Sequence, residues 1–228
     1  MCKIWRARYD VPMYDTFHER VSGHPRPVIL IEGTRELPAD DRPRLTAFAR
    51  WLALTYPHAV FRTGNAKGAD EAFAEGVESV DPARLEYVLP YAGHRKKSDP
   101  SPARRVALDA MPPMAEKNAA YTTEQASPEY ASLLAKRDRV PRLRAKAGYL
   151  LRDTIKVSGA DEADLNKAVF GIFYVNPDDP MKGGTGHTIR VCRTLNVPTA
   201  FQDEWLKWPQ EEKRVNHRGH GGTRREDG

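Results

Sequence analysis

The chain has little cysteine and no long apolar run. Only two of its 228 residues are cysteine, Cys2 and Cys192, which is too few for a disulfide framework and gives no metal-binding spacing. No run of about 18 apolar residues occurs, so no transmembrane helix is expected. Residues 1–6 (MCKIWR) also lack the apolar stretch of a secretory signal. We therefore expect a cytoplasmic protein that does not contact a membrane.

Several catalytic patterns are missing too. The seven histidines are scattered, no His-Glu or Cys-His set has metal-ligand spacing, and no serine lies in a nucleophile-elbow pattern. We expect no metal and no required cofactor. The net charge is +5 with a pI near 9.2, and basic residues gather in 137–152 and 213–225. Such clusters can attract phosphate or nucleic acid, although a solvated helix face and a tail are the simpler interpretation.

The first half of the chain alternates between two patterns. A short, β-branched apolar run at 28–31 ends in a turn at 32–35 and precedes apolar residues at helical spacing over 42–56. The same unit repeats as a strand at 59–62, a turn at 63–68, a helix at 69–78 and a strand at 85–90. This alternation predicts an α/β fold, a Rossmann-like parallel sheet with helices on both faces.

The second half is less regular. Residues 91–127 are rich in proline, serine, alanine and charge, and the Met111–Met114 segment (MPPM) argues against a continuous helix. We expect a long excursion over the carboxyl ends of the strands, with short helices. The sequence leaves open whether this region is a lid, an interface or a disordered insertion. The remaining expected elements are helical structure over 128–158 interrupted at Pro141, a strand at 168–175, a helix at 188–195 and a strand at 197–201.

These elements suggest one domain. We expect residues 1–27 to be an irregular N-terminal extension that packs on it. Residues 28–209 form the domain, with an inserted helical or loop region over about 91–158. Residues 210–228 form a basic tail without core residues, expected to be disordered.

Three glycine-containing turns each follow an expected strand and precede an expected helix. In an open parallel sheet such turns gather at the carboxyl edge, where ligands bind, and the helix N-termini behind them attract anions. Neither the dinucleotide fingerprint nor the Walker pattern is present in the second turn. The turns are Gly33-Thr34-Arg35, the segment from Gly64 to Asp70, and the segment from Lys182 to Thr188.

The turns also carry side chains suited to a phosphate. Arg35 can hold a phosphate with two parallel hydrogen bonds, and Thr34 can donate one. Lys67 can meet an anion. Asp70 either binds a ribose hydroxyl or caps backbone N–H groups. His187 either contacts a base or phosphate or points into solvent.

These turns resemble motifs of the SLOG superfamily. The segment Gly33-Thr34-Arg35 looks like its glycine-small-arginine turn, and Gly64 to Asp70 resembles its glycine-alanine-aspartate turn. Residues 149–153 (YLLRD) are similar to an arginine-asparagine element, from which Asp153 departs. Residues 183–190 (GGTGHTIR) look like the glycine-glycine-threonine segment of the YspA- and DprA-like branches.

The resemblance implies a Rossmann-like fold that binds a nucleotide or a nucleotide derivative. LOG-type hydrolases of this superfamily carry a glutamate after the threonine, where this chain has Thr188-Ile189-Arg190. Only Glu32 and Asp70 are nearby substitutes for a catalytic acid or base. The predicted ligand-contacting residues are Gly33, Thr34, Arg35, Gly64, Lys67, Gly68, Asp70, Arg152, Gly183, Gly184, Thr185, Gly186, His187 and Thr188.

Three functions follow, and the sequence leaves open whether the protein is an enzyme. The leading one is a sensor-type protein that binds a nucleotide. The second is a LOG-like nucleotide N-glycoside hydrolase. The third is a DprA-like single-stranded DNA binder, against which stand the few aromatic residues in the basic stretch. The base and any homo-oligomer also remain open. The basic residues of the third function are Arg137, Arg139, Arg142, Arg144 and Lys146.

Overall fold

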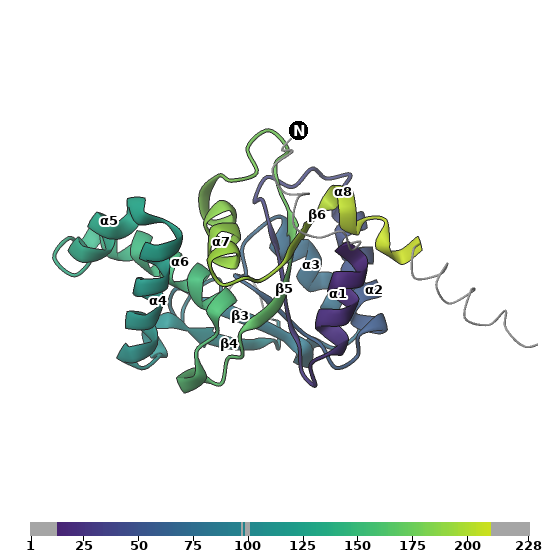
Figure 1. The fold of residues 1–228 in the computed structure, drawn as a ribbon, viewed down its shortest axis with the longest axis horizontal. Helices are drawn as coiled ribbons and strands as arrows, with labels where there is room; N and C mark the ends of the chain where they lie inside the picture. Colours follow the sequence, from purple (N-terminus) through teal and green to yellow (C-terminus); the bar gives the residue numbers. More distant parts are fainter. Residues whose placement is uncertain (1–12, 97, 99–100, 211–228) are drawn as a thin grey trace, which may run out of the picture.

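A six-stranded parallel sheet forms the centre of the molecule (Figure 1). The structure, a computed structural model, describes residues 13–96, 98 and 101–210. Within them the strands lie in the order β4-β3-β2-β1-β5-β6, each pairing parallel to its neighbour. Helices cover both faces of the sheet. The predicted Rossmann-like α/β class is therefore confirmed.

The first half follows the predicted alternation closely. β1 (Val28–Gly33) is buried along its whole length, as expected for a strand covered on both faces. Each further element begins and ends within one residue of its predicted limits. These elements are α2 (Arg42–Thr55), β2 (Val60–Thr63), α3 (Ala69–Glu78) and β3 (Leu85–Leu89).

The N-terminal segment contains a helix, α1 (Met13–Ser22), so the prediction of an irregular extension is wrong for these residues. Tyr14 and Phe17 are three residues apart and therefore lie on one helix face. Phe17 is fully buried, stacks on Trp208 at a centroid distance of 4.7 Å and meets Phe170 edge-on at 5.0 Å. The helix thus packs on the domain. Residues 1–12 lie outside the described part of the chain.

The region after β3 differs most from expectation. It contains a strand, β4 (Arg104–Ala107), which pairs with β3 at the edge of the sheet. Its half-exposed, arginine-rich sequence does not look like a buried strand. The helix α4 (Pro113–Ala126) begins at Pro113, because proline is well tolerated in the first turn of a helix. As predicted, no continuous helix runs through residues 111–114, and the proline pair marks the start of α4.

Two further helices complete this region, and the predicted break at Pro141 is confirmed. They are α5 (Ala131–Lys136) and α6 (Pro141–Ser158). Short 3-10 turns lie at Pro82–Arg84, Leu108–Ala110, Pro128–Tyr130 and Asp161–Ala163.

The last part of the sheet holds the second correction. β5 (Ala168–Tyr174), β6 (Thr199–Phe201) and α8 (Gln202–Trp205) agree with or extend the prediction. α7 (Gly183–Thr194) begins five residues before its predicted start. The third glycine segment is thus the first turn of a helix and not a loop. Its glycines have low helix propensity, which hid this start. The predicted tail beyond residue 210 lies outside the described residues.

The order of the strands creates a switch point. From β1 the chain adds β2, β3 and β4 on one side, and then places β5 and β6 on the other side. Right-handed crossovers therefore put α2 and α3 on one face, with α1, and put α4, α6 and α7 on the opposite face (Figure 1). Ligands of open α/β sheets bind where the direction reverses, here between β1 and β5. None of the described helices is both long and apolar enough to cross a membrane.

Candidate ligand site at the switch point

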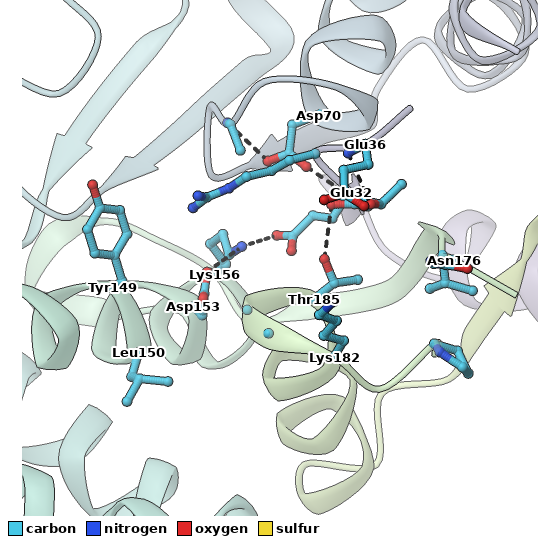
Figure 2. A pocket seen from close by; sticks show the side chains of 18 of the residues that line it. Glu32, Glu36, Asp70, Tyr149, Leu150, Asp153, Lys156, Asn176, Lys182 and Thr185 are labelled. Carbon is cyan, nitrogen blue, oxygen red and sulfur yellow. Dashed lines mark hydrogen bonds and ion pairs between the residues drawn. The ribbon is translucent and has the colours of Figure 1, made fainter. Parts of the chain in front are cut away.

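A cavity of about 460 Å³ opens at the carboxyl ends of β1 and β5 (Figure 2). We call it the switch-point cavity. The turn after β1, the loop after β5, the start of α7 and one side of α6 form its walls. Its volume lies within the roughly 300–1,000 Å³ of small-molecule sites. The lining residues are 32–36, 66, 70, 130, 146, 149, 150, 152, 153, 156, 175, 176, 179, 180 and 182–185.

Four buried charged side chains meet at this cavity. Lys156 Nζ lies 2.6 Å from Glu32 Oε1 and 2.7 Å from Asp153 Oδ1 (Figure 2). Arg152 Nε lies 3.2 Å from the same oxygen of Asp153. No side chain of the four is more than 6% exposed. Two carboxylates and two cations thus form a compact group, named here the cavity cluster.

The two carboxyl groups of the cavity cluster titrate differently. Burial, together with the charges of Asp70 and Asp153, raises the pKa of Glu32 to about 7, although Lys156 opposes the shift. Burial also disfavours the charged form of Asp153, but Arg152 and Lys156 outweigh it and lower the pKa of that carboxyl. Neighbouring carboxyls with pKa values moved apart are a common arrangement of catalytic acids and bases. Near neutral pH, Glu32 can exchange a proton while Asp153 stays ionised.

Asp70 connects the turns after β1 and β2. Its Oδ1 accepts the N–H of Gly33 at 3.1 Å and its Oδ2 accepts the N–H of Ala66 at 3.2 Å. Asp70 is 4% exposed and lines the cavity. Asp70 was predicted either to bind a ribose hydroxyl or to cap backbone N–H groups. Its contacts match the capping role, although the two N–H groups belong to two turns and not to a helix.

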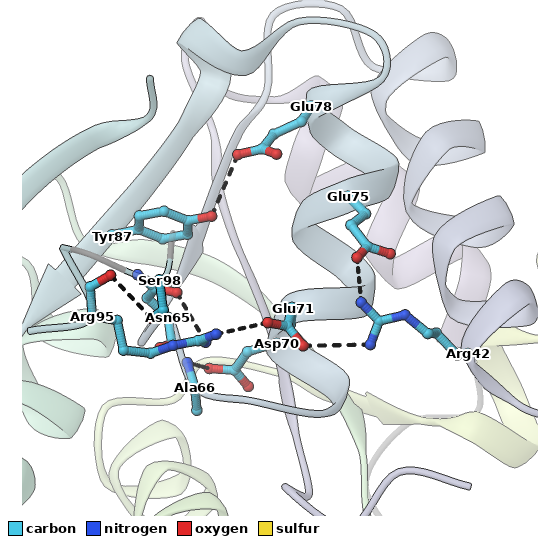
Figure 3. Close-up of polar contacts among 10 residues, drawn as sticks. All are labelled: Arg42, Asn65, Ala66, Asp70, Glu71, Glu75, Glu78, Tyr87, Arg95 and Ser98. Carbon is cyan, nitrogen blue, oxygen red and sulfur yellow. Dashed lines mark hydrogen bonds and ion pairs between the residues drawn. The ribbon is translucent and has the colours of Figure 1, made fainter. Parts of the chain in front are cut away.

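The turn after β2 is also held from outside, by ion pairs shown in Figure 3. Arg95 donates from Nη1 to the carbonyl of Asn65 at 3.2 Å and from Nη2 to Glu71 Oε1 at 2.7 Å. Arg42 reaches the other oxygen of Glu71 and also Glu75. Lys67, in the same turn, is exposed and is not among the residues that line the cavity.

Two predicted glycines serve contacts within the protein. Arg152 donates from Nη1 to the carbonyl of Gly64 at 2.8 Å, and a Cβ on Gly64 would lie 1.6 Å from that nitrogen. Gly68 has a φ of +84° and packs against the carbonyls of Thr34 and Arg35. Glycine adopts this conformation without strain. Both glycines lie outside the cavity lining, as do Gly186 and Thr188.

The first turn of α7 faces the cavity. Gly183, Gly184 and Thr185 line it, and Thr185 Oγ1 donates to the carbonyl of Gly33 at 3.0 Å. The first helical bond runs from Gly186 N–H to the carbonyl of Lys182. Amides that precede it have no acceptor within the helix, and the helix dipole adds partial positive charge there. This turn therefore favours an anion.

His187 lies behind the cavity wall. It is fully buried, and its ring nitrogens lie 3.0 Å from Ser127 Oγ and 3.2 Å from Thr154 Oγ1. Burial lowers its pKa. The alternative that His187 points into solvent is wrong, because helix α7 begins earlier than predicted. His187 does not line the cavity, but its ring packs edge-on against Tyr130, which does, at 5.7 Å.

Three exposed cations stand around the cavity: Arg35, Lys146 and Lys182. Within the described residues none of them forms an ion pair. Lys146 also lies over the Tyr130 ring, 5.7 Å from its centroid. Lys146 belongs to the basic stretch considered for DNA. Of the other members, Arg139, Arg142 and Arg144 are exposed, while Arg137 is half-buried against Glu116.

Lys146, Tyr149, Asp153 and Lys156 form one stripe of α6, which sequence reasoning did not recognise as a cavity wall. Their spacing of three and four residues places them on one helix face. In the sequence, charged and aromatic residues at this spacing among the apolar residues of the helix could have indicated the cavity wall. The region predicted as an excursion over the strand ends, 91–127, contributes no lining residue among those that the structure describes.

The sheet and the cavity at its switch point define a Rossmann-like α/β protein. No family model and no curated protein matches the chain. Among solved structures, the chain is similar to DNA processing protein A from Helicobacter pylori, a structure described for its single-stranded DNA binding mode. The identity is 15% and the TM-score 0.47, over 90% of this chain and 86% of that one. Among the described residues, no group of three or more histidine, cysteine, aspartate or glutamate side chains is arranged to hold a metal ion.

Proposed function

We propose that the switch-point cavity binds a nucleotide or nucleotide derivative and that the protein is a sensor-type member of the SLOG superfamily. One observation carries the proposal: Arg35 and Lys182, which are exposed and have no ion-pair partner among the described residues, line the same cavity as the first turn of α7. Cationic side chains and unpaired helix amides together attract a phosphate.

The rest of the cavity suits the remaining parts of a nucleotide. The carboxylates of the cavity cluster can accept hydrogen bonds from ribose hydroxyls. Tyr130 and Tyr149 supply aromatic surface for a base. Phosphate is expected at the mouth, because the carboxylates deeper in the cavity would repel it.

A thermal-shift panel tests this proposal. It should contain nucleoside mono- and diphosphates, cyclic nucleotides, dinucleotides, ADP-ribose and NAD. A ligand at 100 times its Kd stabilises the folded state by about 2.7 kcal/mol. We expect one class to raise the melting temperature, and Arg35→Ala or Gly184→Asp to abolish the shift.

Lys67→Ala is the matched control, because Lys67 is an exposed cation on a neighbouring turn outside the cavity lining. It should keep the shift. The proposal fails if no compound stabilises the protein, or if Lys67→Ala and Arg35→Ala weaken binding equally.

A second function, hydrolysis of a nucleotide N-glycosidic bond, is favoured by the raised pKa of Glu32. When protonated, Glu32 can donate to the departing base, and when ionised it can accept a proton from the attacking water. Water then forms the new bond to the ribose C1′ as the bond to the base breaks.

Chromatography of nucleoside monophosphates after incubation tests for this reaction. Release of free base that is lost in Glu32→Gln would establish it. If the nucleotide binds and stays intact, the protein binds without hydrolysis.

The sequence's third proposal, single-stranded DNA binding, depends on exposed residues of the basic stretch, such as Arg139 and Arg142. Fluorescence anisotropy of a labelled oligonucleotide at increasing salt would test it. Phosphate contacts predict an affinity that falls steeply with salt.

A further inference from the structure

A second cavity, of about 530 Å³, adjoins the switch-point cavity. Tyr149 lines both cavities. Helix α6 separates them, with Lys146 and Asp153 facing the first cavity, and Ala145 and Gly148 facing the second. One residue thus lies at the boundary of two spaces of similar size.

The second cavity differs from the first in its chemistry. Leu108, Ala147 and Leu151 give it apolar walls. Its arginines are engaged: Arg137 Nε lies 3.1 Å from Glu116 Oε1, and the exposed Arg144 lies 3.9 Å from Asp138.

The lining also holds three carboxylates: Glu116 and Asp138, which pair with those arginines, and Asp109, which accepts the N–H of Ala92. A phosphate would be repelled here. A planar ring with amino groups would find apolar surface for its faces and carboxylate oxygens as hydrogen-bond acceptors.

Aromatic residues gather around Tyr149, the residue that both cavities share. Tyr91 lies edge-on to His94 at 5.4 Å, and His94 lies edge-on to Tyr149 at 6.0 Å. The guanidinium of Arg152 lies 5.6 Å from the centroid of the Tyr149 ring on the other side. Tyr91 is 47% exposed and lines the second cavity. Rings of this kind stack bases.

We propose that the second cavity is a subsite for the second base of a dinucleotide whose first nucleoside and phosphate linkage lie in the switch-point cavity. This inference depends on the proposed function. It names the ligand class as two nucleosides joined through phosphate. The phosphate linkage stays at the mouth of the switch-point cavity, and the second nucleoside passes Tyr149, which both cavities share, so that its base enters the apolar, carboxylate-rimmed space.

Gly148→Leu gives a sharp test, because Gly148 lines only the second cavity. Outside its own stretch of helix, a Cβ built there meets only the carbonyl oxygen of Pro90 within 4 Å, at 3.9 Å. Replacing a glycine inside a helix also favours the helix, so the variant should fold. The leucine side chain would occupy space that the second base needs.

Isothermal titration calorimetry should compare a mononucleotide, a 5′–5′ pyrophosphate-linked dinucleotide and a 3′–5′ phosphodiester-linked dinucleotide. We expect one dinucleotide to bind at least tenfold more tightly than the mononucleotide. Gly148→Leu should remove that advantage and leave mononucleotide binding unchanged, while Gly184→Asp should weaken both ligands. The dinucleotide that binds more tightly shows which type of linkage, pyrophosphate or phosphodiester, the ligand of this site contains.

Each adverse outcome has its own meaning. If the mononucleotide binds and neither dinucleotide binds more tightly, the second subsite is overturned and the proposed function stands. The same holds if a dinucleotide's advantage survives Gly148→Leu. If none of the three ligands binds, both proposals fall.

Discussion

Two clusters of buried charges lie close together in this molecule, but only one of them opens onto a cavity. The other, the sheet cluster, comprises the buried Arg62 and Glu86 together with Arg104, whose side chain is 33% exposed. Arg62 is fully buried and donates from Nε and Nη2 to Glu86 Oε2 at 3.0 and 2.8 Å. Arg104 Nη1 binds the other carboxylate oxygen at 3.0 Å. Arg62 also donates to the carbonyls of Lys156 and Asn166. Arg104 also donates to the carbonyls of Ala163 and Asp164, and its Nη2 lies 3.5 Å from Asp164 Oδ2.

The cavity cluster uses the same residue types for a different result. Lys156 belongs to both regions, since its carbonyl accepts from Arg62 while its ammonium holds Glu32 and Asp153. The charged groups of the sheet cluster contact other residues of the protein, and these contacts join β2, β3 and β4 to the end of α6. In the cavity cluster, burial raises the pKa of Glu32 to about 7, and the cavity exposes that carboxyl to a ligand. The surroundings of a buried ion pair, more than its members, decide whether it is available for chemistry.

The largest expected effect comes from Arg62→Met. Arg62→Met would leave buried Glu86 with the partly exposed Arg104 as its ion-pair partner, and it would remove the donor to the carbonyls of Lys156 and Asn166. Breaking a buried ion pair in this way costs about 3–5 kcal/mol. Urea unfolding at pH 7 should show this loss. In the double variant Arg62→Met/Glu86→Gln the buried carboxylate charge is gone, while the partly exposed Arg104 keeps its contact with Asp164, so part of the stability should return. A loss below 1 kcal/mol (about a third of the smallest expected value) would mean that the sheet cluster does not hold the fold.

The second prediction concerns pH. The pKa of Glu32 is raised from 4.5 to about 7 in the folded protein, so its protonation stabilises the fold fully below pH 4.5. This stabilisation is lost as the pH rises through 7, and it amounts to about 3 kcal/mol. Between pH 4.5 and 7.5 the wild type should therefore lose stability relative to Glu32→Gln.

The comparison with Glu32→Gln isolates this effect. The pKa of buried His187 is lowered, so its contribution runs in the opposite direction, with stability lost as the pH falls. That contribution is present in both proteins and cancels in the difference. Parallel stability profiles for the two proteins would contradict the shifted pKa of Glu32.

The third prediction sharpens the contrast, because Lys156→Met disturbs the cavity cluster but keeps the carbonyl that Arg62 uses. We expect a loss of about 1–3 kcal/mol, smaller than for Arg62→Met. Glu32 can take up a proton when its cation is removed, so the loss should be greater at pH 8 than at pH 5. Urea unfolding at the two pH values checks this. An equal loss at both would show that Glu32 does not respond to Lys156.

Local patterns were enough to predict the sheet, but not the assembly of the site. Apolar runs such as 28–31 identify buried strands, and the turn containing Gly33, Thr34 and Arg35 does line the cavity. β4 was missed because an edge strand needs only one neighbour and few apolar residues. The start of α7 was missed because adjacent glycines resemble a loop. In both cases, tertiary contacts determine the element more than propensity does.

The cavity cluster could not be predicted because it joins distant parts of the chain. Glu32 ends β1, whereas Arg152, Asp153 and Lys156 come from a helix more than a hundred residues later. The sequence suggested Glu32 and Arg152 separately. Nothing local indicates that the buried face of α6 packs toward the end of β1, since that depends on the crossover from β4 to β5.

The smallest expected effect on stability separates binding from folding. Arg35 is exposed at the cavity mouth and has no ion pair within the described residues, so Arg35→Ala should change the free energy of unfolding by less than about 0.5 kcal/mol. The same variant should remove the ligand-induced thermal shift. Arg62→Met should do the opposite, lowering stability while the protein that remains folded still binds. If Arg35→Ala destabilised the protein as much as Lys156→Met, Arg35 would be needed for folding. The cavity mouth would then not be a surface that serves binding alone.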